Sequence, residues 1–451
     1  MGDDVEPESF EDLIGERVKT VRSFLSEAFE DEIAEKNKEP ETTTSEPTID
    51  GPIVPVRFRG RASIGAPTHD LLGDSLMHTF QTMMSRGSPP EFAHWFAHYY
   101  VTEFDKRNGG CWISKQFNPE IYETEGTIEA KKQFTDGLWP FVDDLLSDPL
   151  RSKVMHQKWN GIHISADQMK GRRPKQEDRF VCYPNRNYID QSEDSIALLA
   201  VFDGHGGNEC SHYAAAHFWE EWINSRNLLD GYLEQSLTSA LSSLDERMTK
   251  RSKIEQWKGG TTAVCCAIDS ERKEMAFAWL GDSPGYIMNR MEMRKITRDH
   301  SPNDPIEARR VEEAGGQLFV IGGELRVNGV LNLTRALGDV MGRPMISNEP
   351  ESTRMSIADD DYLVMLVCDG ISDVFALNDL YNLVEAFVQE NDADDYAEMS
   401  DYICKEAIEA GSGDNVTVVI GFLRHPHELW KCLRSVDTSS SSSSESEEET
   451  E

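Results

Sequence analysis

The sequence predicts an α+β protein in which a helical region precedes antiparallel sheets covered by helices. In residues 8–158, apolar side chains recur at the three- and four-residue spacing of amphipathic helices. In residues 159–425, short apolar runs typical of strands dominate, with helical patterns between some of them. Several runs are joined by tight turns such as Asp269-Ser270-Glu271, and tight turns imply antiparallel pairing.

The first region is expected to be an all-helical accessory domain that follows a flexible stretch at residues 1–7. A Thr- and Pro-containing linker is expected at residues 40–51. The segment 91–107 is dense in aromatic residues, which form either the core of this small domain or a surface for a protein partner. The predicted helices span residues 10–38, 70–86, 91–107 and 127–146, the last of them broken near Gly137 and Pro140.

The second region, residues 159–425, is expected to be a separate domain, and its elements follow from runs of apolar residues. Predicted strands span residues 162–165, 180–183, 195–202, 260–268, 274–280, 286–291, 362–368 and 415–423. Predicted helices span residues 208–226, 229–251, 305–314, 378–390 and 393–410, which suggests sheets covered by helices. Residues 426–451 form a Ser- and Glu-rich acidic tail that we expect to be disordered.

Composition limits the partners and the compartment. The 451 residues carry a net charge of −36, which argues against nucleic acid and against anionic membrane surfaces as partners. No run approaches the roughly 20 apolar residues of a membrane span, and the acidic N-terminus lacks the apolar core of a signal peptide. The eight cysteines include no C-x-x-C pair, which is typical of thiols in a reducing compartment. We expect a cytoplasmic protein, with the nucleus as a second compartment.

Four strand-like runs carry a carboxylate beside glycine at one end. Asp-Gly is a common turn signal, so four unrelated surface turns are the alternative interpretation. If the four acids converge, their repulsion requires cations, and oxygen ligands of this kind suit Mg²⁺ or Mn²⁺ rather than zinc. The acids are Asp203 after residues 195–202, followed by Gly204 and His205; Asp282 after 274–280; Asp369 after 362–368; and Asp414 before 416–423.

An arginine upstream of these acids completes the constellation. Arg173 precedes Glu177 and Asp178 by four and five residues, a pattern that alone is read as a surface salt-bridge cluster. Beside a site made of several carboxylates, it becomes a phosphate clamp, because a guanidinium binds two phosphate oxygens at once.

These segments occur in the order found in the PPM, or type 2C, metal-dependent Ser/Thr protein phosphatases, which residues 160–425 resemble. The helical extension ahead of them resembles the calmodulin-kinase-phosphatase branch of that family. The resemblance implies a catalytic β-sandwich of two antiparallel sheets flanked by helices (α/β/β/α), with a dimetal centre at one end. The matching segments are Arg173 with Glu177-Asp178, Asp203 to Gly207, Gly259 to Ala263, Gly281 to Ser283, Leu333 to Asp339, Cys368 to Gly370, and Asp414-Asn415.

The resemblance also implies a role for each matching residue. Two Mg²⁺ or Mn²⁺ ions activate a water that attacks the phosphoryl group in line, and a weaker third metal position accompanies them. His205 protonates the leaving Ser or Thr alkoxide, and Arg173 binds the substrate phosphate. The implied metal residues are Asp203, which bridges both ions; Asp369 and Asp414 at the first; the Gly204 carbonyl at the second, with Glu177 and Asp178 holding its waters; and Asp282 with Asp369 at the third.

The sequence leaves two alternatives to this enzyme. Cys266 and Arg272 have the C-x₅-R spacing of cysteine phosphatases, but the two acids between them would repel phosphate. Cys266 is therefore expected in a strand and Arg272 in a turn. The second alternative is an interaction scaffold that works through the helical N-terminal domain, with catalysis secondary. The expected partners are phosphoserine and phosphothreonine protein substrates of the enzyme, and a protein partner at the helical domain.

Overall fold

A computed structural model describes two compact units of the chain. One unit contains the described residues up to 88 and those from 96 to 159, and the other contains residues 89–95 and those from 160 onward. The expected helix 10–38, the linker 40–51 and the flexible start lie outside the described residues. The residues that the structure describes are 70–108, 117–118, 123–124, 128–147, 161–186, 189, 195–229 and 231–434.

The helical unit confirms the predicted helices that fall within it. Its elements are α3 (Leu71–Ser85), α4 (Pro90–Arg107), the short strands β1 (Phe117–Asn118) and β2 (Glu123–Thr124), and α5 (Ile128–Ser147). The predicted break in α5 was wrong, because the helix runs through Gly137 and Pro140. Buried Phe134 and Phe141 hold the helix on both sides of the proline, and the hydroxyl of Tyr100 donates to the Phe134 carbonyl at 2.6 Å.

The predicted α+β sandwich is confirmed in the second unit, which contains two five-stranded antiparallel sheets. One sheet has the order β15 (Glu351–Ser356), β9 (Glu274–Leu280), β8 (Ala263–Asp269), β5 (Ile196–Phe202) and β4 (Arg179–Tyr183). The other has the order β11 (Met293–Lys295), β10 (Gly285–Asn289), β16 (Asp361–Val367), β17 (Val416–Phe422) and β3 (His163–Met169).

The two sheets pack face to face at a close spacing. Their central strands are buried over almost their whole length, because both faces of each sheet are covered. A Cβ atom on Gly421 of β17 would lie 2.7 Å from the Cδ1 of Leu199 in β5. The glycine therefore allows the sheets to approach at a point where any side chain would force them apart.

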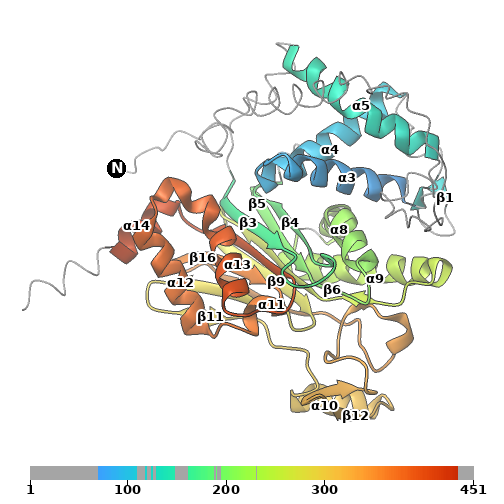
Figure 1. Cartoon of the computed structure of the whole chain (residues 1–451), viewed down its shortest axis with the longest axis vertical. Coiled ribbons are helices and arrows are strands. Elements are labelled where there is room, and N and C mark those ends of the chain that lie inside the picture. Colours follow the sequence, from blue (N-terminus) through green and yellow to red (C-terminus); the bar gives the residue numbers. More distant parts are fainter. Residues whose placement is uncertain are drawn as a thin grey trace, which may run out of the picture. The chain divides into compact units, whose positions relative to one another are not determined.

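Helices cover the outer faces of both sheets (Figure 1). The helices α8 (Glu209–Leu228) and α9 (Leu233–Glu255) pack on the sheet that contains β5. The helices α12 (Leu377–Glu390) and α13 (Met399–Glu409) pack on the sheet that contains β17, and a 3-10 turn, η4 (Ala393–Glu398), precedes α13. Among the described helices, none is both long enough and apolar enough to cross a membrane.

Residues 426–434 correct the expectation of a disordered tail from 426. They form helix α14 (Pro426–Arg434), which begins at a proline, a residue suited to the first helical position. Leu429, Trp430 and Leu433 are buried, and the Trp430 indole donates to the Asn391 carbonyl at 2.6 Å. The helix was missed because charged residues stand between these apolar ones, so the composition of the segment alone does not indicate a buried face. Residues 435–451 lie outside the described residues.

Residues 300–348 form a small substructure that the strand pattern alone did not predict. It contains α10 (Pro305–Glu313) and a two-stranded hairpin, β12 (Leu318–Ile321) and β13 (Glu324–Val327). Gly322 and Gly323 form the turn, and both have positive φ angles, of 65° and 96°. A separate apolar core holds this substructure together: Val311, Val327, Leu333, Ala336 and Ile346, with Leu318, Leu331 and Met345 packed against it.

Candidate active site

The antiparallel register brings the acid-bearing strand ends to one end of the sandwich. In one sheet, the end of β5 lies opposite the start of β4 on one side and the start of β8 on the other. The start of β8 in turn lies opposite the end of β9. In the other sheet, the end of β16 lies opposite the start of β17. Asp203, Asp282, Asp369 and Asp414 adjoin these strand ends, so both sheets supply carboxylates to the same place.

The carboxylates line a cavity of about 640 Å³. Of the residues predicted from the sequence to form the site, those in its wall are Arg173, Glu177, Asp203, Gly204, His205, Asp282, Asp369 and Asp414. The alternative of four unrelated surface turns is therefore wrong. Gly204 fits because its backbone passes close to the preceding loop, where a Cβ atom would lie 2.5 Å from the Glu177 carbonyl oxygen.

Asp178 lies behind this wall rather than in it. Its side chain is 1% exposed, and the hydroxyl of Thr417 in β17 donates to its Oδ2 at 2.6 Å. Burial raises the pKa of Asp178 to about 7, and the negative charges of Asp369 and Asp414 add to the effect. The carboxyl thus joins the loop before β4 to the opposite sheet.

The cavity holds more negative than positive charge. Its wall contains seven carboxylates, of Glu177, Asp203, Asp282, Glu324, Asp369, Asp373 and Asp414, and three basic side chains, of Arg173, Lys175 and Arg326. Burial, followed by the neighbouring carboxylates, raises the pKa of Asp203 well above its ordinary value. Burial likewise raises the pKa of Asp282 to about 7 and that of Asp369 to about 6.

This charge distribution fits divalent cations with oxygen ligands. Carboxylates whose ionised forms disfavour one another are stabilised by a cation between them, and an all-oxygen donor set suits Mg²⁺ or Mn²⁺. Within the part of the chain that the structure describes, no three His, Cys, Asp or Glu side chains are grouped closely enough to hold one ion as they stand. The residues fit such ions because their donor atoms are oxygens and because their carboxylates line one cavity.

Arg173 lies at the mouth of the cavity and pairs with one of its acids. Its guanidinium donates to Asp414 Oδ2, and about half of its side chain remains exposed. Asn415 holds the loop that carries it: the Asn415 amide donates to the carbonyls of Lys170 and Lys175, at 2.8 and 2.9 Å, and accepts from the Glu177 amide at 2.8 Å. The arginine is therefore positioned by the residue next to the acid that it contacts.

His205 is paired with an acid to which the sequence assigned no role. A small three-stranded sheet, β6 (Gly204–His205), β7 (Gly260–Thr261) and β14 (Leu337–Gly338), brings Asp339 beside it. The His205 Nε2 and Asp339 Oδ2 atoms are 2.7 Å apart. Burial lowers the pKa of His205, but the hydrogen bond and charge of Asp339, together with the charges of Asp282 and Asp369, outweigh burial and raise the pKa above its ordinary value.

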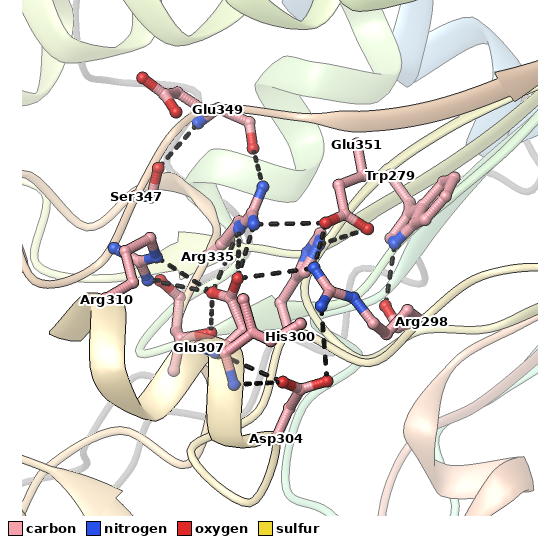
Figure 2. A network of polar contacts seen from close by, with 12 residues as sticks. Trp279, Arg298, His300, Asp304, Glu307, Arg310, Arg335, Ser347, Glu349 and Glu351 are labelled. Atoms are coloured by element: carbon pink, nitrogen blue, oxygen red, sulfur yellow. Dashed lines mark hydrogen bonds and ion pairs between the residues drawn. The ribbon is translucent and has the colours of Figure 1, made fainter.

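A buried ion network holds the substructure of residues 300–348 against the strands (Figure 2). Glu307 of α10 has no exposed surface. It accepts from the Thr334 hydroxyl at 2.7 Å, from Arg335 Nη2 at 2.5 Å and from Arg310 Nε at 3.1 Å. Arg298 joins Glu307 to Glu351 of β15. Since Glu324, Arg326 and Leu331 to Leu333 belong to the cavity wall, this network fixes one side of the site.

Several functional residues were missed, although some carry a signal. Asp339 lay in a noted segment, Leu333 to Asp339, but its partner is 134 residues away. Asp373 follows Asp369 by four residues, one helical turn, in a stretch for which the sequence predicts no helix or strand. Arg326 and Glu324 lie on the hairpin, which Gly322-Gly323 between two apolar runs could have indicated.

The cysteine-phosphatase alternative is excluded by the positions of its residues. Cys266 is fully buried in β8, and burial raises the pKa of its thiol. Arg272 lies in the following turn, where its guanidinium is 3.6 Å from Asp269. The expectation of a strand cysteine and a turn arginine is confirmed.

An α/β/β/α sandwich with carboxylates of both sheets, an arginine and a histidine in one cavity defines a protein serine/threonine phosphatase of the 2C type. The chain belongs to the protein phosphatase 2C family, whose model matches residues 162–416. It is 56% identical, over 94% of each chain, to protein phosphatase fem-2 of Caenorhabditis elegans. It is also 32% identical to human protein phosphatase 1F, over 62% of this chain and 61% of that one.

The fold is also that of a solved structure. The structure of a C. elegans sex determining protein superposes with a TM-score of 0.81 at 54% identity, covering 93% of this chain and 98% of that one. The predicted fold class, family and phosphatase activity are therefore confirmed. Proteins of this family are typically metal-dependent, and phosphoproteins are the substrates that the activity implies.

Proposed function

We propose that the acidic cavity hydrolyses phosphoserine and phosphothreonine with two Mg²⁺ or Mn²⁺ ions, and that a third ion binds more weakly. The observation that carries this proposal is the convergence of Asp203 from one sheet and Asp369 and Asp414 from the other on a cavity that also contains Arg173 and His205. The remaining metal residues in this proposal are the Gly204 carbonyl, Glu177, Asp178 and Asp282.

Bound ions would supply Lewis-acid chemistry, lowering the pKa of a water and offsetting charge on the phosphoryl oxygens. Asp203, Asp369 and Asp414 would hold them directly, since they line the cavity from opposite sheets. Asp178 would act from behind the wall, where its carboxyl is fixed by Thr417. Burial, followed by neighbouring carboxylates, raises the pKa values of Asp203, Asp282 and Asp369, and a cation beside them would favour their ionised forms.

Arg173 would bind the phosphoryl group at the mouth of the cavity. Its exposed guanidinium offers several N–H donors, and substrate oxygens can take the place of Asp414 as their acceptor. Once Asp414 is released from this pair, its carboxylate is available to a cation. Phosphate binding and metal binding would then reinforce each other at a single acid.

His205 would donate a proton to the leaving alkoxide. Asp339 bonds its Nε2, which leaves the other ring nitrogen to face the substrate and favours the protonated ring that a general acid requires. A positioned acid of this kind typically contributes roughly 10²–10⁴-fold in rate.

Phosphate release from a phosphothreonine peptide tests the proposal. The protein would be assayed with Mn²⁺ or Mg²⁺ and with a chelator, alongside Asp203→Asn and the exposed charge-matched control Asp360→Asn. We expect turnover that the chelator and Asp203→Asn abolish, and that Asp360→Asn leaves intact. Turnover that persists at full rate in Asp203→Asn would refute the assignment.

A role in sex determination is proposed from the relatives. The support is 56% identity over 94% of each chain to the phosphatase fem-2, together with the likeness to the C. elegans sex determining protein. Expression of this chain in a C. elegans strain that lacks fem-2 would test it. Rescue by the wild type but not by Asp203→Asn is the expected result, and failure of the well-expressed wild type to rescue would contradict it.

A protein partner at the helical unit and a cytoplasmic and nuclear location complete the proposal. The aromatic residues of segment 91–107 give limited support to a docking surface, because Phe96 and Tyr100 are buried in the unit's own core. Binding of partners to the full chain and to a chain without residues 1–158 would measure its contribution. The location is supported by six buried cysteines that carry free thiols: Cys182, Cys210, Cys265, Cys266, Cys368 and Cys404.

A further inference from the structure

The hairpin beside the catalytic cavity carries exposed apolar side chains. Phe319, Val320 and Ile321 are consecutive residues of β12 and are 45%, 72% and 49% exposed. Single apolar side chains are common on protein surfaces, whereas a contiguous group often marks a binding surface. The core of the substructure does not require them, since Leu318 and Val327 supply the hairpin's contribution to it.

The pleat of the hairpin divides these side chains between two faces. Cross-strand partners share a face, and Phe319 is paired with Arg326 while Ile321 is paired with Glu324. Val320 lies on the opposite face with its partner, Leu325. The exposed apolar group is therefore two side chains on one face and a single side chain on the other.

The face with two apolar side chains continues the wall of the catalytic cavity. Arg326 and Glu324, its polar members, both line that cavity. Leu325, on the opposite face, is absent from this wall and lines a neighbouring cavity of about 420 Å³, to whose wall Glu324 also belongs. Phe319 and Ile321 share the face of the two polar wall residues without lining the cavity themselves, and we call this pair the apolar rim.

Gly329 brings the two members of the apolar rim together. A Cβ atom at this position would lie 3.1 Å from Ile321 Cδ1 and 3.9 Å from Phe319 Cδ2. The absence of a side chain lets both residues lie over the same stretch of backbone. Their exposed surfaces consequently form one continuous apolar patch.

The polar part of the same face carries no net charge. Arg326 and Glu324 form an ion pair at 2.5 Å, and Arg326 also donates to the Val330 carbonyl at 2.8 Å. The guanidinium and carboxylate thus satisfy each other. A substrate that passes over this face would be selected by burial of apolar surface rather than by charge.

Resting on the proposed function, we propose that the apolar rim is a subsite for an apolar side chain of the phosphoprotein substrate. The phosphorylated residue must reach the carboxylates inside the cavity, and an extended chain advances roughly 3.4 Å per residue. Because Arg326 and Glu324 line the same cavity, we place on the hairpin a residue within about three positions of the phosphorylated one, a reach of roughly 10 Å. The preferred substrate is a segment with a leucine-like residue near its phosphothreonine or phosphoserine.

Phosphothreonine peptides that differ at a single position test this subsite. Each peptide would carry Leu or Ser at one of the three positions on either side of phosphothreonine, in an otherwise identical sequence. The full chain would be compared with the double variant Phe319→Ser/Ile321→Ser and with Val320→Ser, the matched control on the opposite face. p-Nitrophenyl phosphate, which is too small to reach the rim, would report on the catalytic site.

We expect the wild type to prefer Leu over Ser at one position by about tenfold in kcat/KM, mainly through KM. The double variant loses this preference, whereas Val320→Ser keeps it, and turnover of p-nitrophenyl phosphate is the same in all three. The substituted side chains are exposed, so the variants should fold.

Other outcomes would overturn the subsite. Normal p-nitrophenyl phosphate turnover without a Leu preference at any position would refute it on the unmodified protein alone. Loss of the preference in Val320→Ser but not in the double variant would place the substrate on the other face. A wild-type dimer that the double variant converts to monomer, without a peptide preference, would assign the rim to self-association. No turnover of the small substrate by metal-loaded protein would instead refute the proposed function, and the subsite with it.

Discussion

Replacing Glu307 with glutamine tests whether the buried ion network holds residues 300–348 in place. Burial alone would raise the pKa of Glu307. Hydrogen bonds from Arg335 and Thr334, with the charges of Arg335 and Arg310, outweigh burial and lower the pKa from its ordinary 4.5 to about 2. Glutamine keeps the shape of the side chain but removes the negative charge that balances Arg335 and Arg310.

The size of the effect follows from that pKa. Each tenfold change in proton affinity between the folded and unfolded states corresponds to about 1.4 kcal/mol. The carboxylate of Glu307 therefore stabilises the fold by about 3 kcal/mol at neutral pH, near the lower end of the roughly 3–5 kcal/mol typical of a broken buried ion pair. If the substructure opens locally, its opening equilibrium should rise by about 10²-fold.

Hydrogen exchange measured by mass spectrometry is the appropriate assay, because it reports on residues 300–348 separately. We expect protection there to fall by about 10²-fold in Glu307→Gln. The control is Glu313→Gln, on the same helix, whose carboxylate pairs with Arg309 at 2.9 Å on an exposed surface and should contribute less than about 1 kcal/mol. Equal protection in the two variants would refute the reasoning.

The dependence on pH has a definite sign. Because the folded-state pKa of Glu307 is depressed, its stabilising contribution is complete above the ordinary pKa of 4.5 and is lost as the pH falls toward 2. The Glu307→Gln variant lacks this contribution at every pH. Its stability should therefore fall less steeply than that of the wild type over this acid range.

Two further predictions concern Asp339, the partner of the proposed general acid His205, and the C-terminal helix. Asp339→Asn should lower kcat for a phosphothreonine peptide by about 10²-fold with little change in KM, because the amide no longer stabilises protonated His205; a kcat within twofold of the wild type would contradict this. Trp430→Ala should lower the free energy of unfolding by about 3–5 kcal/mol, because it leaves a cavity and removes one of the two hydrogen bonds to the Asn391 carbonyl, the other coming from Arg434. Urea titration against the exposed-site control Lys431→Ala would measure the loss, and equal midpoints would contradict it.

The strands and the acids at their ends could be predicted because each is a local pattern. A continuous apolar run that stops at Asp-Gly, as at residues 362–370, indicates both a buried strand and the point where its carboxylate leaves the core. The strand β15 could not be predicted in this way, because Glu351–Ser356 is a polar strand at the edge of its sheet. Its partner, β9, determines its conformation.

The chemistry of the site was less accessible from the sequence where it depends on contacts between distant segments. The pair of His205 and Asp339 requires β7 to lie between β6 and β14, a three-strand arrangement with only two residues per strand. The position of Asp178 behind the cavity wall depends on Thr417, 239 residues away. No local sequence pattern specifies which distant residues will meet. The strand registers of the folded protein determine these contacts.

The origin of the cavity's carboxylates in two separate sheets links its occupancy to the packing of the whole sandwich. A cation held by Asp203 and Asp369 would join the sheets, and by mass action it would stabilise the folded state in proportion to the logarithm of its concentration. The reverse also holds: a core substitution that shifts one sheet relative to the other would alter the spacing of the acids, because Asp203 and Asp369 follow strands of different sheets. Such a substitution would raise the metal concentration needed for half-maximal activity, while the rate at saturating metal would stay the same.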